Sequence, residues 1–453
     1  MNPLTNCKNI YFIGIGGIGM SALARYFNTQ GVVVSGYDKT PTLLTDALVE
    51  EGIQIHFEDD LAKIDKAATV IVYTPAIPNE HGELNYYRDN KYLVVKRSDV
   101  LQWITENAFT IAIAGTHGKT TTTSMTAHIL RHTGYGCNAF LGGIATNYGT
   151  NFWSHEKNVV VVEADEYDRS FLKLAPNIAV ITAVDPDHLD IYGTAEEVVK
   201  AFGEFSDKIK PGGVLIQKWG TAFNTNTSNK TVFSYGYNHN EASYHTSNLK
   251  VVEGSYHFDL VHPAGICKDI ILNMGGLHNV ENVSAAIAIA LSLEIEEVKI
   301  KEAVASFAGV KRRFEYKVKT PNKVLIDDYA HHPEELNALI SGVRSLYPNE
   351  KMVLIFQPHL YSRTKDQCDG FVETLDKADE VILLPIYPAR ELPMEGVSSE
   401  MLLAKMKLSH KKIMSKDELF DWAANSQDKL IVMAGAGDID TCILKVQEIL
   451  TNK

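Results

Sequence analysis

The stretch AFTIAIAGTHGKTTTTSM, residues 108–125, decides the fold of this chain. Residues 109–114 are apolar and predict a buried strand, and the residues from Lys119 onward predict a helix. Gly115 and Gly118 allow backbone N–H groups to approach phosphate oxygens, next to the positive end of the helix dipole. Lys119 supplies a cation, and the hydroxyl of Thr120 can bind Mg²⁺. The stretch therefore predicts a nucleotide-phosphate site.

The spacing of this loop is unusual, because the common phosphate loop has its first glycine where this chain has Ile113. The loop is a shortened form, Gly-x-x-Gly-Lys-Thr. The alternative is a glycine-rich turn with a solvated lysine. The strand before the loop and the helix after it favour phosphate binding.

A second glycine loop lies near the start of the chain. Gly14, Gly16 and Gly19 match the pattern Gly-x-Gly-x-x-Gly after an apolar run, and a helix is predicted over residues 20–30. A second strand, residues 32–37, ends at Asp38, where an acidic residue can meet a ribose hydroxyl. We expect a diphosphate-nucleotide site here, with a purely structural βαβ turn as the alternative.

Composition limits the other possibilities. The chain has 453 residues, enough for about three domains. Its net charge of −13 and the absence of a basic run disfavour nucleic-acid binding. Five scattered cysteines form no C-x-x-C pair, and the glycine-broken start is a strand and not a signal peptide. The longest apolar helical stretch, residues 285–293, is too short for a membrane span. We expect a soluble, cytoplasmic protein.

Strands and helices alternate along three blocks. The pattern predicts an α/β fold with parallel sheets in a domain at residues 1–107, a central domain at 108–312 and a C-terminal domain at 313–453. Residues 221–272 are rich in Asn, Ser, Thr and Tyr and predict a β-rich insertion or edge. The remaining strands are predicted at 10–15, 69–74, 92–95, 158–163, 178–182, 323–326, 352–356, 380–384 and 430–434, with helices at 98–106 and 279–293.

Acidic and histidine residues follow the central strands. Glu163 ends one nearly all-apolar run, and His188 lies in a loop after the next. Since the carboxyl ends of parallel strands carry the ligand site, Glu163 and His188 can join Thr120 around Mg²⁺. A histidine ligand is less usual for that ion and would favour Mn²⁺ as a substitute. Solvated acidic loops are the alternative.

The third block has a polar cluster of its own. Tyr329 and His331 follow one strand, and His359 and Arg363 follow another. Three interpretations are open for the histidines of these two loops: ordinary polar loop residues, zinc ligands or substrate contacts. Zinc is disfavoured because no thiolate accompanies them. We expect substrate-contacting residues in a domain that closes over the central one.

Together these motifs resemble the Mur ligases over essentially the whole chain, in order. The residues that carry the resemblance are Gly14–Ser21, Gly115–Thr121, Glu163–Glu166, Asp187–Asp190, His278–Asn279, Asp328–Pro333 and His359–Thr364. Within the family the pattern looks most similar to the alanine-adding members. The resemblance implies three domains, which hold the UDP moiety, hydrolyse ATP and close on the nucleotide and amino acid, respectively.

The resemblance also implies the reaction. ATP phosphorylates the lactyl carboxylate of UDP-N-acetylmuramate, and the amine of L-alanine displaces phosphate from the acyl phosphate. Such chemistry depends on positioning and charge neutralisation. The catalytic set implied is Lys119, His188, His331, His359 and Arg363, with His188 at a second Mg²⁺. A monomer or homodimer is expected.

The resemblance assigns further residues to each substrate. The ATP contacts implied are Gly115, Thr116, His117, Gly118, Lys119, Thr120, Thr121, Asn279, Asn282, Arg313 and Asp327. The UDP-substrate contacts are Gly14, Gly16, Gly17, Ile18, Gly19 and Asp38. The amino-acid pocket is formed by Tyr329, His331, His359 and Arg363, where Arg363 suits the alanine carboxylate.

The chain departs from the family pattern at two places. Several relatives carry a carbamoylated lysine downstream of the motif histidine, whereas the corresponding region here reads Lys200-Ala201-Phe202-Gly203, with no lysine in register. We therefore expect no carbamate bridge between metals. Leu360 stands where many alanine-adding members have an arginine, so that one phosphate or carboxylate contact is in question.

Three other functions fit part of the sequence. A nicotinamide-dependent dehydrogenase explains the first glycine loop and Asp38, but leaves the phosphate loop without a role. A non-catalytic nucleotide switch leaves the polar strand ends without one. Within the family, the nearest rival is the recycling ligase that joins a whole tripeptide to the same UDP-sugar.

Overall fold

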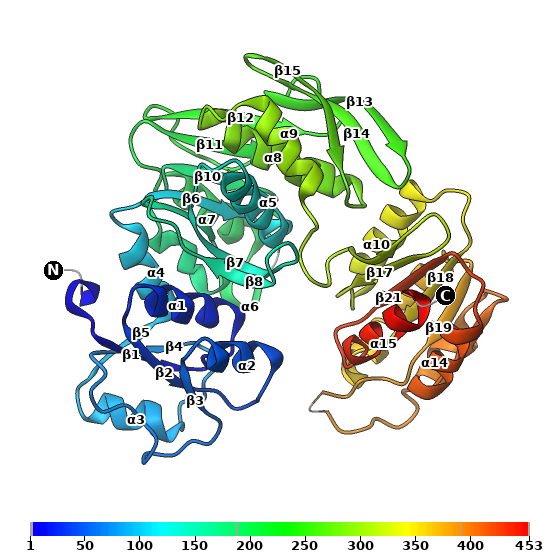
Figure 1. Ribbon diagram of the computed structural model, residues 1–453, viewed down its shortest axis with the longest axis horizontal. Coiled ribbons are helices and arrows are strands. Elements are labelled where there is room, and N and C mark those ends of the chain that lie inside the picture. Colours follow the sequence, from blue (N-terminus) through cyan, green and yellow to red (C-terminus); the bar gives the residue numbers. More distant parts are fainter. Residues whose placement is uncertain (1–2, 187–188, 390, 452–453) are drawn as a thin grey trace. The chain divides into compact units, whose positions relative to one another are not determined.

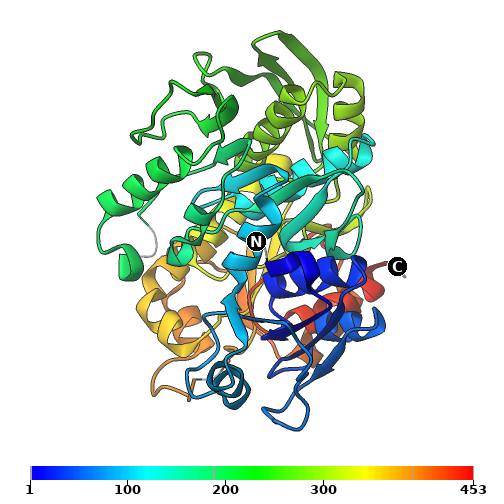
Figure 2. The same ribbon diagram turned by 90° about the vertical axis from the view of Figure 1, so that its left-hand side faces the viewer.

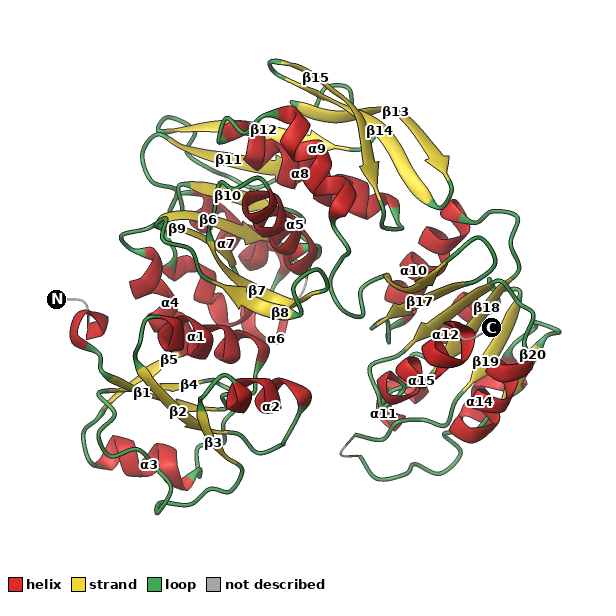
Figure 3. Ribbon diagram, viewed as in Figure 1, coloured by secondary structure: helices red, strands yellow, loops and turns green. Residues whose placement is uncertain are grey.

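The computed structural model describes residues 3–186, 189–389 and 391–451. Helices and strands alternate along the chain (Figures 1 and 3), and the strands form three sheets. The chain forms two compact units, one of residues 1–247, 259–270 and 281–307, the other of residues 248–258, 271–280 and 308–453. This is the α/β architecture that the sequence predicts.

The first sheet contains five parallel strands in the order β3-β2-β1-β4-β5, coloured blue to light blue in Figures 1 and 2. The strand order turns around at β1, so the glycine loop that follows β1 lies at the switch point where open α/β sheets bind ligands. Its elements are η1 (Pro3–Asn6), β1 (Asn9–Ile13), α1 (Ile18–Thr29), β2 (Val33–Tyr37), α2 (Leu43–Glu50), β3 (Gln54–His56), β4 (Val70–Tyr73), α3 (Gly82–Asp89), β5 (Leu93–Lys96) and α4 (Arg97–Thr105).

The second sheet has ten strands in the order β15-β14-β13-β12-β11-β10-β6-β9-β7-β8. Strand β6 pairs in parallel with both β10 and β9, so the loop after β6 is flanked by two further strand ends. The elements are β6 (Phe109–Ala114), α5 (Lys119–His132), β7 (Asn138–Ala145), β8 (Thr150–Trp153), β9 (Val159–Glu163), η2 (Tyr167–Lys173), β10 (Ile178–Ile181), α6 (Leu189–Tyr192), α7 (Ala195–Ser206), β11 (Gly213–Lys218), β12 (Lys230–Gly236), β13 (Tyr244–Val252), β14 (Ser255–His262), β15 (Gly265–Leu272), α8 (Leu277–Ser292) and α9 (Glu297–Ser306).

Strands β6, β9 and β10 are buried along almost their whole length, as parallel strands covered on both faces are. This explains why their sequences are continuous apolar runs without alternation. The β-rich region predicted near residues 221–272 is confirmed, since β12 to β15 extend the same sheet. The hairpin of β7 and β8 is absent from the sequence prediction, because Gly142, Gly143 and Gly149 interrupt any recognisable strand pattern there.

One hydrophobic core connects the first two sheets. Leu23 and Phe27 of α1 belong to the same buried cluster as Phe140 of β7 and Phe152 of β8. The ring of Tyr26 lies 5.5 Å from that of Phe140 and 6.1 Å from that of Phe152. Helix α1 therefore packs against the β7–β8 hairpin within the first compact unit.

The third sheet lies in the second unit and has the order β16-β17-β21-β18-β19-β20. Strand β16 is antiparallel to β17, and the other neighbours are parallel. The elements are β16 (Glu315–Lys319), β17 (Val324–Asp328), α10 (Pro333–Leu346), β18 (Met352–Phe356), α11 (Tyr361–Asp366), α12 (Cys368–Leu375), β19 (Glu380–Leu383), α13 (Ser399–Lys405), β20 (Lys411–Ile413), α14 (Lys416–Asn425), β21 (Leu430–Ala434) and α15 (Asp440–Thr451).

Helix length and hydropathy bear on membrane crossing. Within the described ranges, every helix is too short or too polar to span a bilayer.

Candidate functional site

The phosphate loop joins β6 to α5, as the sequence predicts. Gly115 has φ +136° and Gly118 has φ +81°, both in the left-handed region that glycine tolerates. A Cβ atom at Gly115 would collide with the Thr182 hydroxyl, and one at Gly118 would lie 2.7 Å from the Asn282 side-chain oxygen. Both glycines are thus required by backbone conformation and by close packing. The loop brings the predicted residue Asn282, on α8, next to Gly118.

The end of β10 holds the loop in place. The Thr182 hydroxyl donates to the carbonyl of Ala114 at 3.1 Å and also to that of His117. The Thr116 N–H donates to the Ala183 carbonyl at 3.1 Å, and the Thr116 hydroxyl donates to the Asp185 carboxylate at 3.2 Å. These bonds therefore attach the phosphate loop to the residues that follow β10.

Lys119 is held by two oxygen atoms. Its ammonium donates to the Gly115 carbonyl at 2.6 Å and to Oε1 of Glu166 at 2.7 Å. Glu166 is 1% exposed, so the ion pair lies away from water, where its electrostatic interaction is strong. An ammonium has three donors, and two are accounted for here. Sequence reasoning named Lys119 but missed Glu166, although Glu166 lies in the acidic run after β9.

Helix α5 starts with four threonines, Thr120–Thr123, a poor composition for a helix. The Thr123 hydroxyl donates to the Lys119 carbonyl one turn back at 2.8 Å, and all four residues are buried. Tertiary packing therefore stabilises a helix that local propensity would not. The predicted contacts Thr120 and Thr121 lie in its first turn, at the positive end of the helix dipole.

The predicted metal ligands come from adjacent strands. Glu163 ends β9 opposite Ile113 of β6, and Thr120 follows the loop after β6. A Cβ at Gly142 would collide with the Glu163 carboxylate, so glycine at that position gives the carboxylate its room. Carboxylate and hydroxyl oxygens suit Mg²⁺. The third predicted ligand, His188, lies outside the described residues, among which no cluster of three or more acidic, histidine or cysteine side chains suited to a metal occurs.

The region of the departure around Lys200 is helical. Lys200 lies on α7, and its ammonium is 3.3 Å from the carboxylate of Glu197 on the same helix. This lysine therefore has a local partner in the structure.

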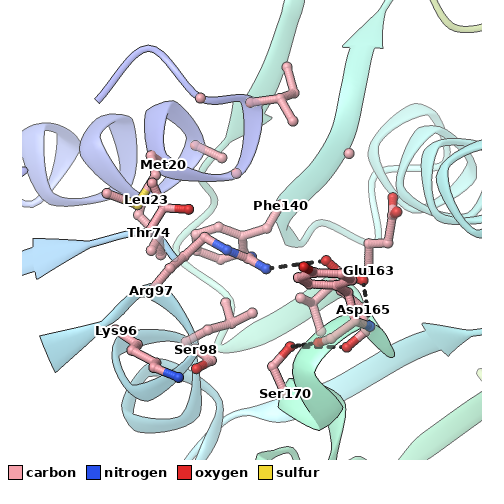
Figure 4. A pocket seen from close by; sticks show the side chains of 18 of the residues that line it. Met20, Leu23, Thr74, Lys96, Arg97, Ser98, Phe140, Glu163, Asp165 and Ser170 are labelled. Carbon is pink, nitrogen blue, oxygen red and sulfur yellow. Dashed lines mark hydrogen bonds and ion pairs between the residues drawn. The ribbon is translucent and has the colours of Figure 1, made fainter. Parts of the chain in front are cut away.

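A cavity of about 520 Å³ lies between elements of the first two sheets, within the first unit (Figure 4). The predicted residues Gly17, Ile18 and Gly19 line it, whereas Gly14, Gly16 and Asp38 do not. Its other polar or aromatic lining includes Thr74, Lys96, Arg97, Ser98, Phe140, Glu163, Asp165, Tyr167, Asp168 and Ser170. Glycine-loop residues and central-sheet acids thus face the same space.

Two cations of the cavity were missed by sequence reasoning. Arg97 is directed at Asp165 in Figure 4, with 3.7 Å between Nη2 and the carboxylate, and Lys96 is 3.7 Å from Asp168. A Cβ at Gly19 would lie 3.2 Å from the Arg97 guanidinium, so Arg97 stands beside the first turn of α1. Cations next to a helix N-terminus suit an anionic ligand, and Phe140 and Leu101 add apolar surface. The signal available in the sequence was a basic pair at a strand end.

Asp38 braces the glycine loop. Its carboxylate accepts from the Gly16 N–H at 2.8 Å and from the Thr40 N–H at 3.1 Å. The predicted contact between Asp38 and a ribose stays a prediction.

The four residues of the predicted amino-acid pocket lie together in the second unit. The rings of Tyr329 and His331 are 5.1 Å apart, and those of His331 and His359 are 6.0 Å apart. Arg363 donates to Nδ1 of His359 at 3.4 Å, and the His359 ring stacks on Tyr387 at 5.7 Å. Burial, followed by the nearby charge of Arg363, lowers the pKa of His359. The lowered pKa favours the neutral imidazole, which fits the bond that Nδ1 accepts from Arg363.

Leu360, the second departure from the family pattern, has φ +69°. Its N–H donates to the Tyr387 carbonyl at 2.9 Å, just before α11. A branched side chain in the left-handed region is strained, and strain of this kind is found mainly where the surrounding structure enforces it.

Asp327 is buried beside Arg312. The carboxylate is 3.6 Å from Nε of Arg312, whose guanidinium lies 5.1 Å from the centre of the Tyr329 ring. Burial raises the pKa of Asp327 to about 7, against the opposing effect of Arg312. Of the two ATP contacts predicted in the C-terminal domain, Asp327 is thus buried and Arg313 is exposed. The cation next to Asp327 is Arg312, and the ATP contact of Arg313 stays a prediction.

Asn279 lies at the start of α8. Its amide donates to the Gly275 carbonyl at 2.6 Å, which secures the turn that precedes the helix.

Models of one family match most of the chain. They are the Mur ligase family catalytic domain over residues 9–108, the Mur ligase middle domain over residues 113–290 and the Mur ligase glutamate ligase domain over residues 312–437.

Curated relatives are similar along their whole length. The UDP-N-acetylmuramate--L-alanine ligase of Flavobacterium psychrophilum is 46% identical over 454 residues, covering 99% of this chain and 100% of the relative. The enzyme of the same name from Porphyromonas gingivalis is 47% identical over 451 residues, covering 98% and 99%.

Solved structures agree with this. The UDP-N-acetylmuramate-alanine ligase of Thermotoga maritima, at 28% identity, covers 99% of this chain and 100% of its own with a TM-score of 0.83. A murein peptide ligase from Psychrobacter arcticus shares the fold at 21% identity, with a TM-score of 0.66 over 98% and 99% of the two chains. Family models, relatives and fold all lead to one conclusion: the chain belongs to the Mur ligase family.

Proposed function

We propose that this protein is an ATP-dependent ligase that joins L-alanine to the lactyl carboxylate of UDP-N-acetylmuramate, in peptidoglycan precursor synthesis. The observation that carries the proposal is that one compact unit holds both the phosphate loop after β6 and a cavity suited to an anion. Acidic residues at the end of the neighbouring strand β9 line that cavity. The full-length similarity to alanine ligases supports the choice of substrates. A dehydrogenase would leave the Lys119–Glu166 pair without a purpose.

The proposed placement of the substrates follows the charges of the site. The phosphates of ATP bind the backbone N–H groups of Gly115, His117 and Gly118 and the first turn of α5, with Lys119 as counter-ion. The diphosphate of the UDP-sugar binds in the cavity at the first turn of α1, where Arg97 and Lys96 exchange their carboxylate partners for phosphate oxygens. The lactyl carboxylate then points toward the side of the cavity lined by Glu163.

The chemistry needs activation of a poor electrophile. A carboxylate resists attack by an amine, and transfer of the γ-phosphoryl group converts one of its oxygens into a leaving group. Lys119 neutralises charge on the transferring group, and the loop keeps donor and acceptor in line. Attack by the alanine amine then releases phosphate and forms the amide bond.

Mg²⁺ fits the donor set at Thr120 and Glu163, with His188 as the further ligand inferred from the sequence. When bound, the ion neutralises charge on the phosphate oxygens, and Mn²⁺ is the expected substitute. The absence of a lysine in register means that water or other side chains complete any second metal site.

We further propose the division into domains at residues 1–107, 108–312 and 313–453. In this scheme the third domain supplies Tyr329, His331, His359 and Arg363 for the amino acid, and Arg313 and Asp327 for ATP. A cytoplasmic location, and a monomer or homodimer, belong to the same proposal.

A phosphate-release assay tests the function. With ATP, Mg²⁺ and UDP-N-acetylmuramate, we expect release to depend on L-alanine, with glycine used roughly 10–200-fold less well, because a pocket gains little from one methyl group. L-serine should be a weak substrate, and bulky or acidic amino acids should be rejected. A clear preference for the tripeptide that begins with L-alanine would replace this assignment with that of the recycling ligase.

A further inference from the structure

Asn151 stands at the contact between the central sheet and α1. It lies on β8 and is completely buried, at 0% exposure. Its side-chain amide donates to the Ile18 carbonyl at 2.6 Å and to the Ser21 hydroxyl at 3.0 Å. Ile18 is the first residue of α1 and lines the cavity. Asn151 of the β7–β8 hairpin thus hydrogen-bonds to the first turn of α1, which lines the cavity.

Arg25 continues the contact along the helix. Ile18, Ser21 and Arg25 are spaced so that they share one face of α1. The Arg25 guanidinium, in a residue 6% exposed, donates to the Asn151 side-chain oxygen and makes bonds of 2.7 and 2.9 Å to Glu51 after α2. Hydrogen bonds from Glu51 to Arg25, from Arg25 to Asn151 and from Asn151 to Ile18 therefore connect α2, α1 and β8, and the bond between Arg25 and Asn151 is buried.

The first turn of α1 has few restraints of its own. Its N-cap, Gly17, has no side chain to cap the helix, and no side-chain cap bond is formed. The Ile18 carbonyl instead receives the Ser21 hydroxyl at 2.9 Å in addition to Asn151. The N–H groups in the first turn of a helix have no partner within the helix, and their direction is set by the backbone of that turn. The bonds to the Ile18 carbonyl therefore also determine where these donors of α1 point.

We propose that Asn151 is a positioning residue for the UDP-sugar site, through which the central domain aims the α1 anion-binding turn of the N-terminal domain. This inference rests on the proposed function. It predicts that the hairpin of one domain sets the substrate affinity of the other, although Asn151 itself does not line the cavity.

Two variants separate the bonds that the Asn151 amide donates to α1 from the bond that its oxygen accepts from Arg25. Asn151→Ala removes both the grip on Ile18 and the acceptor for Arg25. Asn151→Asp keeps an acceptor for Arg25 but can no longer donate to the Ile18 carbonyl. Should Asn151→Ala fail to fold, Asn151→Asp carries the test, because the buried guanidinium keeps its partner.

Asn138 offers a matched control on the same hairpin. It is 8% exposed, and its amide donates to the carbonyls of Lys157 and Val159 at 3.2 and 3.4 Å, away from α1. Asn138→Ala should lower the unfolding temperature without a selective effect on any substrate.

The measurement is the KM of each substrate, with the unfolding temperature of each variant. We expect the KM of UDP-N-acetylmuramate to rise about 10- to 100-fold in both Asn151 variants, since a misplaced binding group costs this much. The KM values of ATP and L-alanine, and kcat at saturation, should stay within about twofold. An unchanged UDP-sugar KM in folded Asn151→Asp, or an equal rise in Asn138→Ala, would overturn the inference. If the unmodified protein showed no L-alanine-dependent phosphate release, the proposed function itself would fail.

Discussion

The two glycine loops of the first unit are built alike but charged differently. Each follows an interior strand of its sheet, and each leads into a helix. The phosphate loop after β6 carries its own cation, Lys119, clamped by Glu166. The glycine loop after β1 carries none, and Arg97 from α4 stands beside its last residue, Gly19. A glycine loop before a helix can therefore be paired with a cation from the loop itself, as with Lys119, or with a cation from another element, as with Arg97.

The braces of the two loops differ as well. At the glycine loop, one carboxylate, Asp38, accepts a backbone N–H directly. At the phosphate loop, the Thr182 hydroxyl donates to carbonyls, and one backbone N–H, that of Thr116, donates to the Ala183 carbonyl. The glycine loop uses the N–H groups of residues 14–17 for its own support, whereas the phosphate loop uses that of Thr116.

The largest effect on turnover is expected at Lys119. Lys119→Ala should lower kcat by on the order of 10²-fold or more, because the transferring phosphoryl group loses its counter-ion. The same change leaves the buried Glu166 carboxylate without its ammonium, which destabilises the fold by about 3–5 kcal/mol. Phosphate release and thermal unfolding measure the two effects separately.

A double variant provides the control for that experiment. Lys119→Met with Glu166→Gln removes both charges, so stability should recover while turnover stays low. Near-normal phosphate release by the folded double variant would remove Lys119 from the mechanism.

Arg97 should contribute more to the binding of UDP-N-acetylmuramate than to turnover. Arg97→Ala should raise the KM of UDP-N-acetylmuramate roughly 10- to 100-fold, because a hydrogen bond to a charged group contributes about 1.5–3 kcal/mol. Arg97→Lys should lose less. Arg88→Ala is the control, since Arg88 packs on the Tyr73 ring and does not line the cavity. A fall in kcat with an unchanged KM would mean that the two loops share one role.

Loss of the Glu166 charge should weaken the catalytic contribution of Lys119 without abolishing it. Glu166→Gln keeps an oxygen acceptor for the Lys119 ammonium but removes the charge, so kcat should fall by about 10-fold with little change in the KM of UDP-N-acetylmuramate. Single-turnover phosphate formation checks this. An equal change in the UDP-sugar KM would indicate that the effect spreads through the loop after β9 into the cavity.

The smallest effect is expected at Asp38. In Asp38→Asn the Gly16 N–H keeps a neutral acceptor, a loss of about 1 kcal/mol, or roughly fivefold in the KM of the UDP-sugar. A 2′-deoxyuridine analogue distinguishes a brace from a ribose contact. If Asp38 held the ribose, the penalty for the missing hydroxyl would shrink in the variant, and if it only braces the loop, both proteins would show the same penalty.

Much of the site was readable because its geometry is local. Gly115, Gly118 and Lys119 lie within one loop between a strand and a helix, and that order was enough to place them. The cluster of His331, His359 and Arg363 was predicted for a related reason, since the ends of parallel strands meet at one edge of a sheet. The pairing of Arg312 with Asp327 was not predicted, because it depends on backbone angles that sequence patterns do not specify.

By itself, the sequence determined the α/β class, the two glycine loops and the apolar strands that precede them, because left-handed glycines and buried β-branched runs are properties of short segments. Only the tertiary structure decided the partners of those loops. Glu166 beside Lys119, Arg97 beside Gly19 and Asn151 on Ile18 join residues 47, 78 and 133 positions apart. Such pairs form where sheets and helices pack against each other, and no local pattern encodes them.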